Sequence, residues 1–159
     1  MLFPNAVAPH NVIPNTLNNE SILVEKYIKS SPPSVQMYYF IKKYSKLYNV
    51  PLKMVYKIAT LETNYKNPLN FKYNPSQISY ANAYGPMQLL LSTAKSVAKD
   101  TSITIQQLLT NVELNVKTSV CYMMELYLEY HDWAKVAAHY NSGSSKMNDY
   151  AMEIKNLDL

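Results

Sequence analysis

The segment LKMVYKIATLETNYK, residues 52–66, decides the fold class, because its apolar residues recur at helical spacing. At about 100° per residue, the predicted helix has an apolar face of Met54, Val55, Ile58, Ala59, Leu61 and Tyr65 opposite a polar face of Lys53, Lys57, Thr60 and Asn64. Glu62 falls inside the apolar arc, where burial would raise the pKa of its carboxyl group toward the range of a general acid. A slightly rotated helix would instead let Glu62 reach solvent or pair with a lysine.

Proline-rich stretches and further helical patterns surround this segment. Residues 1–34 contain five prolines, which predicts an extended arm with at most one or two helical turns around residues 20–29. Residues 66–87 contain three more, and we expect an irregular loop with a functional role. Helices are predicted over residues 35–48, 88–100, 103–109, 111–130, 133–140 (capped by Asp132) and 146–156. The chain is thus predicted to be mainly α with little or no β structure, as an arm (residues 1–34) and a compact domain (residues 35–159).

The composition limits the expected partners. The formal charge is +4, and every positive side chain is a lysine because the sequence has no arginine. Lysines suit loose attraction to an acidic polymer, whereas base reading usually relies on arginine, so we expect no nucleic acid partner. Cys121, the only cysteine, cannot form an intramolecular disulfide, and no apolar run approaches the length of a membrane span. His10, His131 and His139 are too scattered for a metal site, so no metal or other cofactor is expected.

The only two glycines, Gly85 and Gly143, indicate positions where a side chain is not tolerated, although an ordinary turn or helix C-cap explains each taken singly. Together with Glu62 they belong to four segments: Glu62-Thr63-Asn64-Tyr65; Gly85-Pro86-Met87-Gln88 followed by Thr93-Ala94; Asn115-Val116 with Tyr122; and Ala138-His139-Tyr140-Asn141-Ser142-Gly143. In order and spacing these segments, which span about residues 50–143, resemble the lytic transglycosylase (SLT-type) domain of the goose-lysozyme-like family. That family runs Glu-Ser-x-Phe/Tyr, Gly-Leu-Met-Gln, Asn-Ile-x-x-Gly-x-x-Tyr and Ala-Tyr-Asn-Ala-Gly.

The resemblance implies a lysozyme-like helical domain around a substrate cleft, with Glu62 as the catalytic acid. It implies a substrate-binding set of Ser79, Met87, Gln88, Tyr122, Tyr140 and Asn141, in which Ser79 contacts the muramic acid and Tyr140 is a candidate to orient the carboxylate. Thr63, Tyr65, Gly85, Asn115 and Gly143 belong to the structural parts of the motifs. The chain departs from the family at Thr63 (usually serine), Pro86 (leucine), Asn82 and Ser119 (glycines) and His139 (alanine), and its interval from Glu62 to Gln88 is longer. For His139, a packing role and a substrate contact both stay open.

Glycoside cleavage normally uses two carboxylates, but no other Asp or Glu lies between Glu62 and Gln88. The next candidates, Asp100 and Glu113, have the pattern of solvated or capping groups. A transglycosylase needs only one carboxylate. Glu62 would protonate the glycosidic oxygen between N-acetylmuramic acid and N-acetylglucosamine, and would then take the proton of the muramic C6 hydroxyl as it attacks C1. We therefore expect peptidoglycan glycan strands as the substrate and a 1,6-anhydro sugar as the product.

Two other functions stay open. A goose-type lysozyme would hydrolyse the same bond and would need a second carboxylate facing Glu62. A non-catalytic wall-binding or virion structural protein would keep the fold without turnover. The N-terminus lacks the pattern of a secretory signal, so we expect delivery to the cell wall by other means, such as a bacteriophage particle. The arm would then tether the domain to a virion or cell-envelope assembly.

Overall fold

The computed structural model describes residues 19–159, and their side chains from residue 21 onward. The predicted arm before residue 19 lies outside the described residues. The chain divides into two parts after Ser30. The first part holds the helix α1 (Asn19–Lys29), whose 11 residues exceed the one or two turns that the sequence predicted. The second part, residues 31–159, carries the cleft described below.

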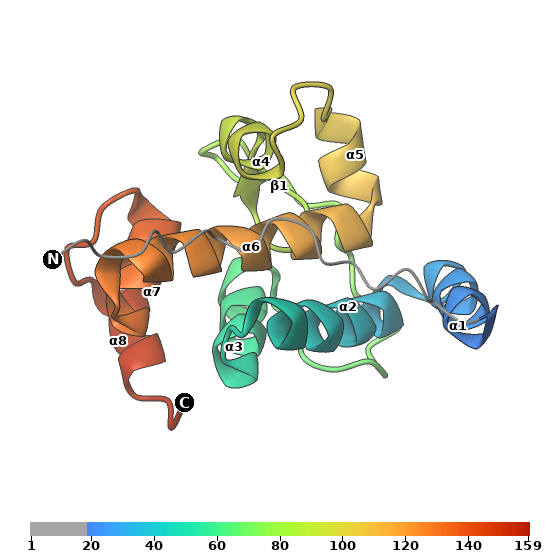
Figure 1. Ribbon diagram of the computed structural model, residues 1–159, viewed down its shortest axis with the longest axis horizontal. Helices are drawn as coiled ribbons and strands as arrows, with labels where there is room; N and C mark the ends of the chain where they lie inside the picture. The colour runs from blue at the N-terminus through green and yellow to red at the C-terminus, as the bar shows by residue number, and fades with distance from the viewer. Residues whose placement is uncertain (1–18) are drawn as a thin grey trace, which may run out of the picture. The chain divides into compact units, whose positions relative to one another are not determined.

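Residues 31–159 are built around one long central helix, α6, which crosses the middle of this part of the chain (Figure 1). Helix α6 packs against α2 on one side and against α4 and α5 on the other, and α7 packs near its C-terminal end. The helices are α2 (Pro33–Tyr48), α3 (Leu52–Thr63), α4 (Leu91–Ala98), α5 (Ile105–Thr110), α6 (Val112–Tyr130), α7 (Trp133–Ser142) and α8 (Asp149–Lys155). The predicted mainly α fold class is confirmed.

Local chemistry sets the helix boundaries. Helix α2 begins at Pro33, two residues before the predicted start, because proline suits the first position of a helix, where the missing N–H needs no partner. Helix α3 ends at Thr63, before the predicted end at residue 66, because Asn64 at its C-cap adopts a left-handed φ of 57°. The predicted capping role of Asp132 is confirmed, since its carboxylate accepts the N–H groups of Ala134 (2.8 Å) and Lys135 (3.3 Å) at the start of α7.

The prediction that a helix begins at Gln88 is wrong, because a short β-hairpin precedes that helix. Strand β1 (Ala83–Tyr84) pairs antiparallel with β2 (Leu89–Leu90), and α4 begins only at Leu91. Gln88 has a φ of 50°, outside the right-handed helical region, and its Nε2 donates to the Gly85 carbonyl at 2.8 Å. A short apolar run fits a buried strand or a helix equally well, so periodicity alone does not separate them.

The turn of this hairpin is held by Asn115, a fully buried polar residue of α6. Its Oδ1 accepts the Met87 N–H at 3.0 Å, and its Nδ2 donates to the carbonyls of Tyr84 (2.8 Å) and Leu108 (3.1 Å). Gly85 has a φ of 79°, and a Cβ atom there would collide with the Leu108 carbonyl and the Asn115 side chain. Both the backbone conformation and the lack of space therefore exclude a side chain at position 85.

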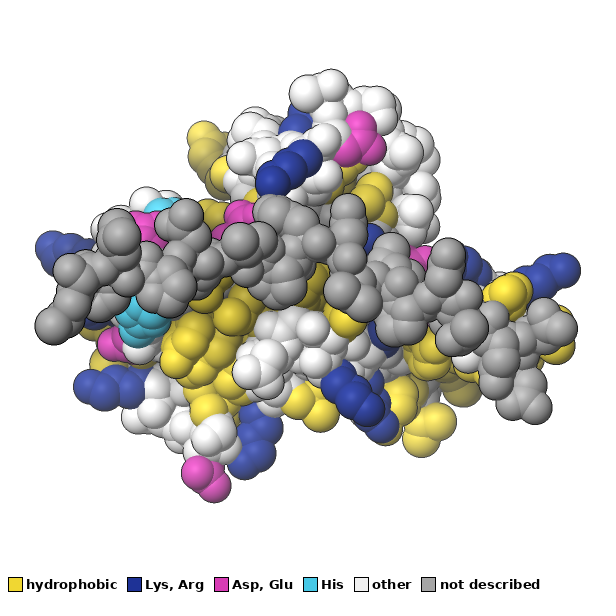
Figure 2. Space-filling model, viewed as in Figure 1, with side chains coloured by type: hydrophobic (Ala, Val, Ile, Leu, Met, Phe, Trp, Pro, Cys, Tyr) yellow, Lys and Arg dark blue, Asp and Glu magenta, His cyan; other side chains and the backbone are white. Residues whose placement is uncertain are grey.

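Charged side chains are dispersed over residues 31–159. Three lysines form ion pairs with acidic side chains on other elements: Lys43 with Glu113 (3.4 Å), Lys53 with Asp158 (3.8 Å) and Lys57 with Glu153 (2.7 Å). The lysine side chains that are visible in Figure 2 stand at separate places on the face shown. Between residues 19 and 159, none of the helices combines the length and the apolar character that crossing a membrane requires.

The two glycines provide a matched test of how the hairpin is packed. Gly143 has a φ of 71°, but a Cβ atom there would meet no other atom within 4 Å. We expect Gly143→Ala to lower the free energy of unfolding by about 1–2 kcal/mol, the cost of a left-handed backbone alone. Gly85→Ala should lower it by about 2–5 kcal/mol, because overpacking adds to that cost. Urea denaturation measures both, and equal losses would contradict the close contact at Gly85.

Candidate active site

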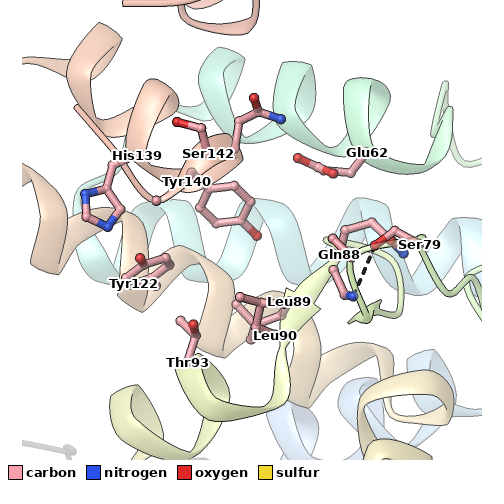
Figure 3. Close-up of a pocket in the computed structure, with 14 residues that line it drawn as sticks. Glu62, Ser79, Gln88, Leu89, Leu90, Thr93, Tyr122, His139, Tyr140 and Ser142 are labelled. Carbon is pink, nitrogen blue, oxygen red and sulfur yellow. Dashed lines mark hydrogen bonds between the residues drawn. The ribbon is translucent and has the colours of Figure 1, made fainter. Parts of the chain in front are cut away.

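Glu62 projects from the last turn of α3 into a cleft of about 460 Å³ (Figure 3). The walls of the cleft come from the loop before β1, the hairpin, α4, α6 and the C-terminal end of α7. The structure thus brings together segments far apart in the sequence. Residues of the implied site that line the cleft with Glu62 are Ser79, Gln88, Tyr122, Tyr140, Asn141 and Gly143.

The Glu62 carboxyl group is half-buried, and it forms no ion pair with a lysine of the described residues. Burial raises its pKa above the ordinary value of a glutamate, because a charge in a poorly solvated place is unfavourable. A hydrogen bond from the Tyr150 hydroxyl to Glu62 Oε1, at 2.7 Å, partly offsets this rise by stabilising the ionised form. Burial thus favours the neutral form of this carboxyl group, and the hydrogen bond favours the ionised form.

Tyr150 is the site residue that the sequence reasoning missed. It lies in the first turn of α8, and burial raises the pKa of its hydroxyl well above the ordinary value, with the nearby Glu62 adding to the rise. The hydroxyl therefore stays protonated and acts as a donor to Glu62. The resembled motifs end at Gly143, so no spacing pointed to Tyr150. The only available signal was an aromatic residue in the predicted helix 146–156.

Tyr140 is near Glu62, but its hydroxyl donates to the Met87 carbonyl at 2.7 Å and forms no hydrogen bond with the carboxylate. Burial, and then the charge of Glu62, raise the pKa of the Tyr140 hydroxyl. Its ring lies against that of Tyr122, with the centroids 5.8 Å apart. Met87 itself is fully buried and does not line the cleft. Its backbone, held by Tyr140 and Asn115, supports the cleft wall.

Thr63 and Tyr65 join the end of α3 to the loops around it. The buried Thr63 hydroxyl donates to the Pro86 carbonyl at 2.8 Å and also lies 2.8 Å from the Tyr73 hydroxyl. The buried Tyr65 hydroxyl donates to the carbonyl of Ser34 at 3.0 Å. These contacts fix the helix turn that carries Glu62 against the hairpin and against α2.

Ser79 and Asn141 stand at the edges of the cleft. Ser79 closes a tight turn, since its N–H donates to the Ala83 carbonyl (3.0 Å) and its Oγ accepts the Ala83 N–H (3.1 Å). Asn141 Oδ1 accepts a hydrogen bond from Asn148 Nδ2 at 3.3 Å, which links α7 to the cap of α8. Gly143 ends α7, and its N–H donates to the His139 carbonyl at 2.7 Å.

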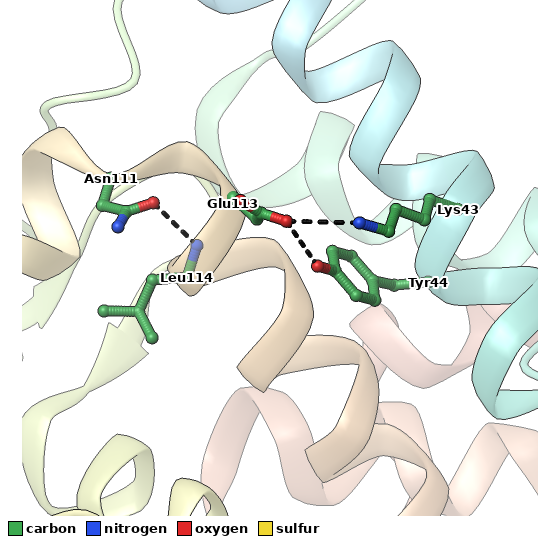
Figure 4. A network of polar contacts seen from close by, with 5 residues as sticks. All are labelled: Lys43, Tyr44, Asn111, Glu113 and Leu114. Atoms are coloured by element: carbon green, nitrogen blue, oxygen red, sulfur yellow. Dashed lines mark hydrogen bonds and ion pairs between the residues drawn. The ribbon is translucent and has the colours of Figure 1, made fainter. Parts of the chain in front are cut away.

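Among the side chains that the structure describes, Glu62 is the only aspartate or glutamate that lines the cleft. Glu113, at the start of α6, accepts hydrogen bonds from the Tyr44 hydroxyl (2.7 Å) and Lys43 (3.4 Å) of α2 (Figure 4). Asp100 is exposed, and the Ser102 hydroxyl and N–H that it accepts, at 2.6 and 2.8 Å, hold its pKa below the ordinary value. Neither group faces Glu62 across the cleft. Within residues 19–159, His, Cys, Asp and Glu side chains do not gather into a group of three or more that could hold a metal ion.

A helical fold with a half-buried carboxyl group in a partly aromatic cleft defines a class of protein suited to acid–base chemistry on a ligand bound there. The family model of the Transglycosylase SLT domain matches residues 39–158, and the chain belongs to this family. The resemblance noted from the motifs is thereby confirmed. Lytic transglycosylases act on peptidoglycan, so the cell wall is where a protein of this family works. A comparison with curated proteins found no match.

Glu62→Gln tests whether burial of the Glu62 carboxyl group lowers the stability of the folded protein. Its pKa is higher in the folded protein than in the unfolded chain, so the wild type loses stability as pH rises from the unfolded through the folded pKa. Glutamine cannot ionise, and its carbonyl can still accept the Tyr150 hydrogen bond. We therefore expect Glu62→Gln to unfold at higher urea concentration than wild type at pH 7, with the difference lost below about pH 4. A difference independent of pH would contradict this account.

Proposed function

We propose that the protein cleaves the β-1,4 bond between N-acetylmuramic acid and N-acetylglucosamine in peptidoglycan by transglycosylation, with Glu62 as both acid and base. One observation carries the proposal: from residue 21 onward, Glu62 is the only carboxyl group that lines the cleft, and its burial raises its pKa. Membership of the transglycosylase family supports the substrate class. A hydrolase with two carboxylates would need a second carboxylate facing Glu62, and the described lining residues of the cleft include none.

In the first step the protonated Glu62 donates its proton to the glycosidic oxygen as the bond from that oxygen to C1 of the muramic acid breaks. The raised pKa of Glu62 keeps a fraction of the carboxyl group protonated at a higher pH than an ordinary glutamate allows. The departing sugar leaves with a new hydroxyl group at O4. Glu62 is then a carboxylate, which the Tyr150 hydroxyl stabilises through its hydrogen bond.

In the second step the Glu62 carboxylate accepts the proton of the muramic C6 hydroxyl, and O6 forms a bond to C1. The product is a 1,6-anhydro sugar, Glu62 returns to its protonated form, and no water is consumed. Ser79 and Gln88 line the cleft beside Glu62 and are proposed to contact the muramic acid. Tyr122, Tyr140 and Asn141 are proposed to line the path of the strand.

Mass analysis of the muropeptides released from purified peptidoglycan tests the proposal. We expect anhydro-muramic ends from the wild type and a loss of rate of about 10²–10⁴-fold in Glu62→Gln, the usual contribution of a general acid. Glu125→Gln, which neutralises an exposed carboxylate of α6 outside the cleft, is the matched control and should retain the rate. Reducing muramic ends would replace the proposal with hydrolysis. No release from several wall types would favour a non-catalytic wall-binding protein.

Tyr150→Phe should change the pH dependence of kcat/KM. The hydroxyl donates to the Glu62 carboxylate and lowers its pKa, so its removal raises that pKa further. Because the reaction begins with protonated Glu62, the basic limb of the pH profile should move to higher pH. Tyr39→Phe, which removes a hydroxyl of α2 outside the cleft, should leave the profile unchanged. A basic limb that stays in place in Tyr150→Phe would show that another group sets it.

A further inference from the structure

His139 lies in the cleft, although no motif of the resembled family has a histidine at this position. It stands on α7 next to Tyr140, at the end of the cleft away from Ser79 (Figure 3). The edge of its ring meets Tyr122, with the ring centroids 6.3 Å apart and the planes at 82°. A polar ring and an aromatic ring thus lie side by side in the same wall.

The Nδ1 atom of the His139 imidazole already has a hydrogen-bond partner. The Tyr130 hydroxyl lies 2.7 Å from His139 Nδ1, which ties the last turn of α6 to α7. Tyr130 does not line the cleft, so a ligand in the cleft does not compete directly for the Tyr130 hydroxyl. Turning the ring would break this hydrogen bond, and the orientation of the imidazole is therefore fixed before any ligand arrives.

The other nitrogen, Nε2, has no hydrogen-bond partner among the described residues, although His139 lines the cleft. Whichever atom donates in the contact with Tyr130, one ring nitrogen remains to donate or accept toward a ligand. Sugar hydroxyl and acetamido groups offer both kinds of partner. Aromatic side chains beside a few placed polar groups are typical of sites that bind such ligands.

We propose that His139 binds the glycan strand at the end of the cleft away from Ser79, through a hydrogen bond between its Nε2 and a hydroxyl or acetamido group of an N-acetylated sugar. Tyr130 is a positioning residue that holds the imidazole in the required orientation. This inference rests on the proposed function, because it takes a glycan strand as the ligand. It adds a contact that sets strand affinity and leaves the chemical step to Glu62.

The chain offers a substitution at His139 with little risk to folding. The resembled family has alanine at this position, and a short side chain there is compatible with its helix. His139→Ala removes the proposed contact, and His139→Gln restores a polar group that reaches about as far as Nε2. His131→Asn is the matched control, because it removes an exposed imidazole outside the cleft. His131 has a φ of 50°, a conformation that asparagine tolerates.

Titration calorimetry of purified, uncrosslinked glycan strands tests the contact in the Glu62→Gln protein, which does not consume them. We expect His139→Ala to weaken binding about three- to tenfold, the usual range for one hydrogen bond. His139→Gln should recover part of the loss, Tyr130→Phe should weaken binding by a smaller factor, and His131→Asn should leave it unchanged. In the active protein, His139→Ala should raise KM by a similar factor with little change in kcat.

An unchanged affinity in His139→Ala, or an equal loss in His131→Asn, would overturn the inference. So would a fall in kcat without a rise in KM, which would give His139 a part in the chemical step. The product assay with the wild type decides the proposed function separately. If Glu62→Gln bound no strands while the wild type released anhydro ends, the inference on His139 would fail and the proposed function would stand.

Discussion

The cleft depends on a single backbone turn, residues 85–88, which three helices hold from different sides. Asn115 of α6 binds the Met87 N–H, Thr63 of α3 donates to the Pro86 carbonyl, and Tyr140 of α7 donates to the Met87 carbonyl. Each of these contacts, two buried and one partly buried, satisfies a polar backbone group that would be costly to leave unpaired away from water. The glycine at position 85 lets α5 and α6 approach this turn closely, because any side chain would collide there. The position of Glu62 relative to the opposite wall follows from this turn.

The same scaffold keeps one carboxyl group in an unfavourable place. Burial favours the neutral form of Glu62, and the Tyr150 hydroxyl favours the ionised form. These opposing effects suit the role proposed for Glu62, in which it first donates and then accepts a proton. The other two carboxylates that were candidates from the sequence form contacts outside the cleft. Glu113 accepts hydrogen bonds from Tyr44 and Lys43. Asp100 is bound by Ser102 at the surface. A stable fold and a reactive site thus use the same residue type in different environments.

Two tyrosines at the cleft show how position changes the role of a side chain. The sequence made Tyr140 a candidate partner of the Glu62 carboxylate, but the Tyr140 hydroxyl donates to the Met87 carbonyl in the hairpin turn. The hydrogen bond to Glu62 comes instead from Tyr150 of the following helix. A third tyrosine, Tyr130, does not line the cleft, and its hydroxyl contacts Nδ1 of His139. The contacts of Tyr150 and Tyr130 join residues on different helices, and that of Tyr140 joins α7 to the hairpin turn. Sequence spacing alone contains no information about such contacts.

The sequence by itself determined the helical class, the cap at Asp132, the two glycine positions and the identity of Glu62 as the exceptional polar residue of its helix. These features follow from local rules: apolar period, capping chemistry and backbone conformation. Only the tertiary structure decided that residues 89–90 form a strand, that Met87 is buried behind the cleft wall, and that Tyr150 contacts Glu62. The physical reason is that burial and hydrogen bonding between distant segments depend on how the helices pack, and packing is a property of the whole domain.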